Sequence, residues 1–253
     1  MTAPAPTLPL QTRAAIFLRL LAVQGSWNYE TMLGNGIAFA VEPALRLLPG
    51  GSGGPAYRAA LARQGGYFNA HPYLASVAVG ALARAELDGE APERIERFRT
   101  ACCGPLGSVG DRLVWAGWLP ACSLLALCAY GLGASAAGVV ALFLGLFNLG
   151  HVALRVWGLR AGFRDGLRVA QSLGAPLLRQ GPAQLARVVA LVGGIALPLS
   201  VRGVAGTTSW ALAIVVGSAA LGAAILARLH GRVEGRRLAV AGLAAFLLFA
   251  ALR

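Results

Sequence analysis

Between Leu113 and Gly150 the chain carries no charged residue, a run of 38 positions. One membrane-spanning helix needs about 20 residues, so this run is too long for one span and suits two. We expect the two spans to be joined by a glycine-rich bend at Gly131–Gly138. Charged residues make up only 13% of the chain and mean hydropathy is +0.66, whereas soluble domains carry roughly 25% charged residues. The sequence therefore predicts an all-α, polytopic helical membrane protein.

Further apolar runs follow in the C-terminal part, at Leu185–Val201, Val204–Ala227 and Leu238–Leu252. We expect a short turn at Arg202 and Gly203 between the first two, and the last run is short for a full span. No internal repeat or soluble second domain is evident. We predict one membrane domain over residues 1–253, with a flexible N-terminus (1–11), a motif region (12–112) and transmembrane hairpins (113–253).

The arginines predict the orientation of these spans. If the apolar regions are hairpins, three basic stretches fall on one side, at Arg94–Arg112, Arg155–Arg187 and Arg228–Arg237, and the turns hold only Arg202. The positive-inside rule makes that side cytoplasmic and sends the C-terminus outward, in a bacterial inner membrane protein. The net charge of +12 does not indicate nucleic acid, because the arginines flank apolar runs and do not form one patch.

The first hundred residues have a different character. Interrupted or re-entrant helices are expected at Leu33–Leu48 and Tyr73–Leu87, because Glu42, Pro43 and Arg84 break these apolar runs. The remaining segments of this region are an amphipathic interfacial helix at Leu10–Val23, a flexible linker at Pro49–Pro55, and a charged helical connector at Glu86–Arg99 in which Glu93 and Arg97 have i, i+4 spacing.

Polar groups are costly in a membrane unless they pair or line a wet path, so polar motifs are candidate solute sites. The first motif is Gln24–Glu30. In a helix, Gln24 and Asn28 share a face, and with Glu30 they supply the amides and carboxylate that bind sugar hydroxyls. Trp27 and Tyr29 add flat apolar surfaces. The alternative is a polar helix end capped by its own side chains.

The second motif is Phe68–Tyr73. The residue before a proline avoids helix, so His71 is expected to be extended, with a helix beginning at Pro72 and Asn69 as its cap. His71 is either a solute-path residue or a hydrogen-bonded structural residue. No nucleophile pattern accompanies it.

The third motif, Gly104–Asp111, holds three glycines and a proline and is expected to break the helix. Broken backbone at membrane depth is tolerated only where protein or a water-filled cavity satisfies it. Asp111 would then cap the next helix, accept hydrogen bonds from a sugar, or pair with Arg112.

The fourth motif is Leu146–Gly166. In a helix, its residues Asn148, His151 and Arg155 could form one polar stripe, and Arg155 is expected to be an interface anchor.

These four motifs, in this order, resemble those of the IID component of the mannose/fructose/sorbose branch of the sugar phosphotransferase system. The resemblance covers about Thr12 to Gly166. It implies a membrane subunit that pairs with IIC to translocate a hexose, which cytoplasmic IIB phosphorylates with phosphoryl groups delivered through IIA. It also implies that the chain itself is not an enzyme and has no catalytic residue, cofactor or metal, and that membrane lipid but no nucleic acid is among its partners.

The candidate solute-path or interface residues are Gln24, Asn28, Glu30, Asn69, His71 and Asp111. Gly107 and Ser108 replace the Ala-Gly of the resembled pattern, and Arg112 stands beside Asp111 where a small or neutral residue is usual. Arg112 and the compact C-terminal third, with only a short turn near Arg202, leave a second interpretation open, in which the chain is a non-transporting scaffold or regulatory subunit with the same fold. An intramembrane enzyme would need a nucleophile–base or metal constellation, and the four cysteines have no ligand spacing.

Overall fold

The computed structural model describes residues 8–169, 174 and 176–205. In this part of the chain every regular element is helical. The elements are α1 (Leu10–Leu21), α2 (Gly34–Leu45), the 3₁₀ turn η1 (Gly51–Gly53), α3 (Pro55–Gln64), α4 (Ala75–Leu87), α5 (Pro92–Gly110), the π-helix η2 (Asp111–Trp118), α6 (Leu119–Gly131), α7 (Ala136–Asp165), the 3₁₀ turn η3 (Gly166–Arg168) and α9 (Pro176–Ala205).

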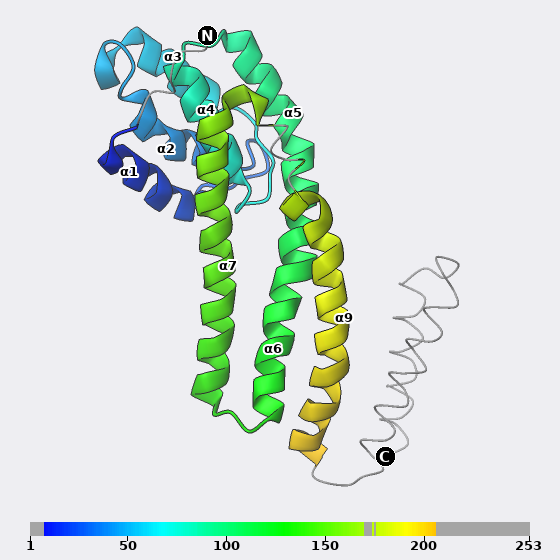
Figure 1. The fold of residues 1–253 in the computed structure, drawn as a ribbon. Coiled ribbons are helices and arrows are strands. Elements are labelled where there is room, and N and C mark those ends of the chain that lie inside the picture. Colours follow the sequence, from blue (N-terminus) through cyan, green and yellow to red (C-terminus); the bar gives the residue numbers. More distant parts are fainter. Residues whose placement is uncertain (1–7, 170–173, 175, 206–253) are drawn as a thin grey trace, which may run out of the picture.

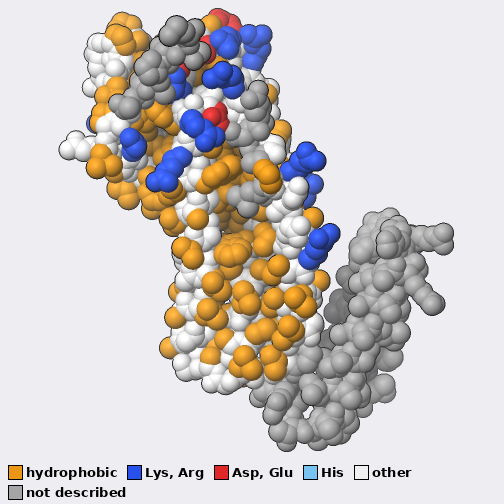
Figure 2. All heavy atoms as spheres, in the orientation of Figure 1, with side chains coloured by type: hydrophobic (Ala, Val, Ile, Leu, Met, Phe, Trp, Pro, Cys, Tyr) orange, Lys and Arg blue, Asp and Glu red, His pale blue; other side chains and the backbone are white. Residues whose placement is uncertain are grey.

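The helices form two regions, which we call the head and the stalk (Figure 1). The head contains α1 to α4 with the first part of α5 and the last part of α7. The stalk consists of α6, the first part of α7 and α9, which run side by side away from the head (Figure 1). Figure 2 shows that apolar side chains cover much of the visible stalk surface, whereas basic side chains gather on the head.

Helix α4 is the centre of the head. It is almost entirely buried and crosses α7 at backbone distance. A Cβ added to Gly162 would lie 2.1 Å from the carbonyl oxygen of Val77, and one added to Gly80 would lie 2.4 Å from that of Leu159. Only glycine permits this approach, which is the way small residues bring membrane helices together.

Buried ion pairs also hold the head. Arg63 donates two hydrogen bonds to the carboxylate of Glu86, at 3.0 and 2.8 Å, and Gln64 donates a third at 2.6 Å. Arg99 donates to Gln64 Oε1 at 2.7 Å, which joins α5 to this network. On the other side of the head, Glu42 accepts from Arg19, Arg46 and Tyr57. Burial opposes ionisation of Glu42, but those three donors outweigh it and hold its pKa below the ordinary value.

The predicted hairpin over the uncharged run is confirmed. Two described helical segments are long and apolar enough to cross a membrane: Pro92–Gly131, with 40 residues, and Ala136–Arg168, with 33. They meet at a turn after Gly131, where Gly133 takes a left-handed φ of 92° and Ser135 caps α7 by accepting a hydrogen bond from Gly138 N at 3.2 Å. Both arms continue past the uncharged run, and their ends help to build the head.

Several local predictions are wrong. Gly104–Asp111 does not break the helix, because α5 continues through Pro105 to Gly110 and the backbone changes only to a π-helix at Asp111. Its glycines are helical, and Gly110 serves close packing: a Cβ there would lie 2.2 Å from His71 Cβ. Arg202 and Gly203 form no turn either, since α9 continues through them to Ala205.

Other differences concern where helices begin and which partners they use. Helix α4 begins at Ala75, three residues after Pro72, with no side-chain cap, so Asn69 is not its cap. Gln24 lies in a turn and does not share a helical face with Asn28. Arg97 donates to the backbone carbonyl of Glu93 and not to its carboxylate. The linker Pro49–Pro55 contains the 3₁₀ turn η1.

Some predictions lie outside the described residues: most of the N-terminal segment 1–11, nearly all of the run Val204–Ala227, the basic stretch Arg228–Arg237 and the run Leu238–Leu252. Re-entry of the segments before Leu113 into the membrane stays a prediction.

Candidate functional site

Backbone hydrogen bonds connect the second motif to the third and to the segment that directly follows the first. The segment after the first motif pairs with the second motif, because Leu33 N donates to Phe68 O at 2.8 Å and Phe68 N donates to Thr31 O at 3.2 Å. The second motif in turn lies on α5, where His71 N donates to Leu106 O at 3.4 Å. The loops before α2 and α4 are thereby fixed against the helix that carries the third motif.

Asn28 shapes the loop that contains the first motif. Its Oδ1 accepts from the backbone N–H of Glu30 and Thr31, at 2.9 and 2.8 Å, and its Nδ2 donates to Ser26 O and Thr31 Oγ1. An asparagine that bonds the backbone two and three residues ahead is a local turn former. All four of these hydrogen bonds are local, so in this structure Asn28 acts as a scaffold residue of the loop.

His71 is 2% exposed and lies between aromatic rings. Its ring centroid is 5.0 Å from those of Tyr73 and Trp115, and its Nδ1 accepts from Tyr73 N at 3.2 Å. An accepting Nδ1 puts the proton of the neutral ring on Nε2, which has no hydrogen-bond partner among the described residues. Burial, and secondarily the charge of Arg155, lowers the pKa of His71 to about 4. The neutral ring is therefore the form present near pH 7.

Tyr73 connects the second motif to the fourth. The His151 ring stacks on it at 4.8 Å with an interplanar angle of 25°, and the Arg155 guanidinium carbon lies 4.9 Å from the ring centroid. We refer to these side chains, with two neighbouring rings, as the Tyr73 cluster: His71, Tyr73, Trp115, Phe147, His151 and Arg155. Its members come from the second and fourth motifs and, through Trp115, from the π-helix that follows the third.

Arg155 is 3% exposed, so the prediction that it anchors the interface is wrong. Its NH1 group donates to the carbonyl of Leu20 in the last turn of α1. The final carbonyls of a helix lack intrahelical donors and carry partial negative charge, which explains why a guanidinium is stabilised there. The ring of Tyr73 adds a cation–π contact.

Unpartnered polar atoms distinguish the Tyr73 cluster from the rest of the described structure. The buried side-chain nitrogens without a hydrogen-bond partner there are His71 Nε2, His151 Nδ1 and Arg155 Nε, and all three side chains contact Tyr73. Buried polar groups are nearly always paired in proteins, so an accumulation of unpaired ones marks a candidate site for a polar group.

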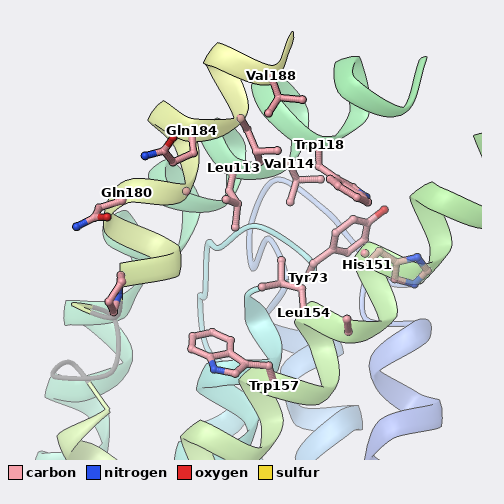
Figure 3. Close-up of a pocket in the computed structure, with 15 residues that line it drawn as sticks. Tyr73, Leu113, Val114, Trp118, His151, Leu154, Trp157, Gln180, Gln184 and Val188 are labelled. Carbon is pink, nitrogen blue, oxygen red and sulfur yellow. The ribbon is translucent and has the colours of Figure 1, made fainter. Parts of the chain in front are cut away.

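A cavity of about 600 Å³ opens beside the cluster, between η2, α7 and α9. Tyr73 and His151 lie on one side of it and Gln180 and Gln184 come from α9 on the other, as Figure 3 shows. Its walls are otherwise largely apolar, with the indole rings of Trp118 and Trp157. A mostly apolar cavity with a few polar groups is the usual form of a small-molecule site.

The six candidate residues from the sequence are distributed unevenly. His71 lies in the Tyr73 cluster, and Asn28 is half-buried in its own loop. Gln24, Glu30, Asn69 and Asp111 are exposed, and no described contact joins them to the cluster. The backbone N–H of Glu30 donates to Asn28 Oδ1 within its own loop, and that of Asn69 donates to Cys103 Sγ on α5.

Sequence reasoning missed Tyr73, Trp115, His151 and Arg155 as one site. The spacing of His151 and Arg155, one helical turn apart in an apolar helix, was the available signal. In the described part of the chain, no three His, Cys, Asp or Glu side chains form a group that could hold a metal ion.

Residues 7–199 match the family described as PTS system mannose/fructose/sorbose family IID component. The chain is 31% identical over 177 residues to the mannose-specific EIID component of Escherichia coli K12, covering 65% of this chain and 59% of that protein. It is 31% identical over 172 residues to the sorbose-specific EIID component of Klebsiella pneumoniae, covering 66% of this chain and 61% of that protein. It is 29% identical over 167 residues to the fructose permease IID component of Bacillus subtilis, covering 63% of this chain and 58% of that protein. The match thus spans about three fifths of the length of these relatives.

Two solved structures share the fold. One, with a TM-score of 0.57 and 22% identity, is a chain in a complex of the mannose transporter ManYZ with microcin E492, matched over 97% of both chains. The other is described as a membrane protein, with a TM-score of 0.70 and 22% identity over 98% of both chains.

Proposed function

The chain belongs to the PTS mannose/fructose/sorbose family of IID components, and from that premise we propose that it is the IID subunit of a mannose-type sugar permease. In this role it pairs with IIC in a bacterial cytoplasmic membrane and helps a hexose to cross. The observation that carries the proposal is the convergence of the motifs: backbone bonds join the second motif to the third and to the segment after the first, and Tyr73 joins the second to the fourth.

The chemistry of the reaction belongs to other subunits in this proposal. Cytoplasmic IIB transfers the phosphoryl group to the sugar after receiving it through IIA, and this chain is non-catalytic. Its contribution is to shape the path. The neutral His71 ring, with a free Nε2–H, and the half-buried His151 would offer hydrogen bonds to sugar hydroxyls, and the aromatic rings would face the apolar side of a sugar ring.

An apolar stalk surface supports the pairing with another membrane subunit. Large apolar side chains are exposed along all three stalk helices; they are Leu125, Tyr130, Val140, Leu142, Leu144, Leu149, Val188, Leu191 and Ile195. Soluble monomers rarely expose such a continuous surface, so it is expected to meet lipid tails or the helices of a partner.

Sidedness follows from the arginines. The turn between Gly131 and Ala136 has no charge, whereas the opposite end of the hairpin carries the arginines of α5 and of the last part of α7. The positive-inside rule puts that basic end in the cytoplasm and the turn outside. The same rule puts the C-terminus outside.

The site within this subunit is proposed to include the six sequence candidates Gln24, Asn28, Glu30, Asn69, His71 and Asp111. Among them, His71 has the strongest support, because its free Nε2 lies among the polar atoms of the Tyr73 cluster. Gln24, Glu30, Asn69 and Asp111 are exposed, and in this proposal they meet a partner subunit or a solute at the surface of the chain.

The test is phosphoenolpyruvate-dependent uptake of labelled hexoses into cells that express the cognate IIA, IIB and IIC, with and without this chain. Uptake that requires the chain supports the proposal and identifies which tested sugars it helps to carry. If the chain co-purifies with IIC and no tested hexose enters, the scaffold interpretation gains. Failure to associate with IIC contradicts the proposed role.

A further inference from the structure

A groove with a cationic rim lies between α1 and α7. Its volume is about 570 Å³, and its walls include Ala14, Phe17, Val156 and Phe163. A second hollow of about 500 Å³ shares Val156, Arg160 and Arg164 with it and continues along α7 past Val152 and Leu149. The two hollows adjoin along the strip of α7 that carries these three residues, and we call the pair the channel; its cationic end holds the arginines.

Three guanidinium groups line this channel: those of Arg13, Arg160 and Arg164. All three side chains are exposed. Arg13 donates to the carbonyl of Leu8, and Arg164 is paired with Asp165, so its charge is largely compensated. Arg160 has no hydrogen bond or ion pair to any described residue. The lining residues include no Asp or Glu, so Arg13 and Arg160 give the rim a net positive charge.

The channel crosses the boundary between the apolar and basic parts of the surface. Exposed Leu144, Leu149 and Val152 lie on the stalk side of α7, and Arg160 follows eight residues after Val152, about 12 Å further along the helix. Figure 2 shows the same change, with basic side chains on the head above the mainly apolar stalk surface. This is the level at which arginines meet lipid headgroups.

We propose that this channel binds an anionic membrane phospholipid. Its phosphate lies between Arg13 on α1 and Arg160 on α7, and an acyl chain follows Val156, Val152 and Leu149 toward the stalk. Basic pockets between membrane helices bind acidic headgroups in this way. Free inorganic phosphate would gain nothing from the apolar walls, and a zwitterionic lipid would bring a second positive charge to a rim that is already positive.

The binding of lipid to the full-length chain, purified in detergent, tests the proposal. Native mass spectrometry is used to compare phosphatidylglycerol with phosphatidylcholine of identical acyl chains. We expect preferential retention of phosphatidylglycerol, and a loss of about five-fold in its affinity for Arg160→Gln, which corresponds to about 1 kcal/mol per basic residue near a headgroup. Arg97→Gln is the matched control, because Arg97 is an exposed arginine of α5 outside the channel.

Further variants distinguish a lipid bound in the channel from a lipid held only by general electrostatic attraction to the basic surface. Arg13→Gln should reproduce the effect of Arg160→Gln from the other helix. Val156→Phe leaves all charges in place and narrows both hollows, so it should also weaken phosphatidylglycerol binding. Each variant is compared only if its melting temperature matches that of the wild-type chain.

The proposal is overturned if the two lipids are retained equally, if Arg97→Gln weakens binding as much as Arg160→Gln, or if Val156→Phe has no effect. Displacement of phosphatidylglycerol by millimolar inorganic phosphate would also overturn it, because the site would then be one for free anions. None of these measurements depends on sugar transport, so the proposed lipid site and the proposed transport function can be contradicted independently of each other.

Discussion

At the scale of single residues, Arg155 shows what a sequence pattern leaves open. An arginine after an apolar run is equally compatible with a side chain that reaches the headgroups and one that inserts between helices. The choice depends on α1, which brings the carbonyl of Leu20 to the guanidinium although the two residues are 135 positions apart. Because nothing near Arg155 in the sequence encodes that contact, its burial could not be predicted.

The motif residues were easier to find than their roles. The polar residues within an apolar chain correctly singled out His71. Its neighbours in the folded structure, Tyr73, His151 and Trp115, had no sequence feature that set them apart from ordinary aromatic or flanking residues. Asn28 is an acceptor for its own loop, and that role needs only local spacing. The sequence had left such a capping role open as the alternative to a solute contact.

The first prediction concerns the exposed carboxylates of the motifs. If Glu30 and Asp111 meet a solute, Glu30→Gln and Asp111→Asn should lower uptake by about ten-fold or more, since a hydrogen bond to a charged group contributes about 1.5–3 kcal/mol. Both residues are exposed, so the variants should assemble with IIC at wild-type levels. Labelled-hexose uptake and co-purification are the two measurements.

Glu96→Gln provides the control for these variants, because Glu96 is an exposed carboxylate of α5 outside the motifs. It should transport like the wild-type chain. Wild-type uptake in both Glu30→Gln and Asp111→Asn would remove these two residues from the proposed site.

At the scale of elements, the contact between α4 and α7 is the most extensive in the head. Gly158 and Gly162 lie one turn apart on α7, and a Cβ on Gly158 would come within 2.2 Å of Ser76 Oγ. The Gly-x-x-x-Gly spacing is visible in the sequence, but its partner helix is not. Such spacing is typical of closely packed membrane helices, but the specific pairing of α7 with α4 required the structure.

The second prediction tests this contact. Gly162→Ala should destabilise the chain by about 1–3 kcal/mol, because the added methyl group meets the backbone of Val77 and cannot be accommodated by a side-chain movement. The expected readout is a lower melting temperature in detergent. Gly145→Ala is the control on the same helix, since nothing lies within 4 Å of its added Cβ. Equal melting temperatures for the two variants would contradict the packing argument.

At the scale of the whole molecule, hydropathy was the most reliable guide. An uncharged run of 38 residues correctly predicted a helical hairpin and its glycine-rich turn. Hydropathy could not show that the two arms of the hairpin extend to Pro92 and Arg168. Both helices continue through charged or glycine-containing segments where these segments pack in the head. Within Gly104–Asp111, Leu106 and Gly110 are buried, and their packing offsets the helix-breaking tendency that the composition suggests.

The third prediction concerns orientation. In a variant without the native cysteines, Ala134→Cys in the hairpin turn should react with a membrane-impermeant maleimide in intact cells, because the positive-inside rule puts this turn outside. Glu90→Cys, at the start of the basic end, should react only after permeabilisation. The reverse pattern of labelling would invert the proposed topology.

The uninterrupted helix from Pro92 to Gly131 has a mechanical consequence. The side chain of His71 packs against this helix at Gly110, and Gly110 divides the helix into two arms of similar length. The arm toward the hairpin turn covers 21 residues and is roughly 30 Å long at 1.5 Å per residue. If this helix tilts about its contact with His71, a tilt of about 10° moves the far end of the hairpin by roughly 5 Å.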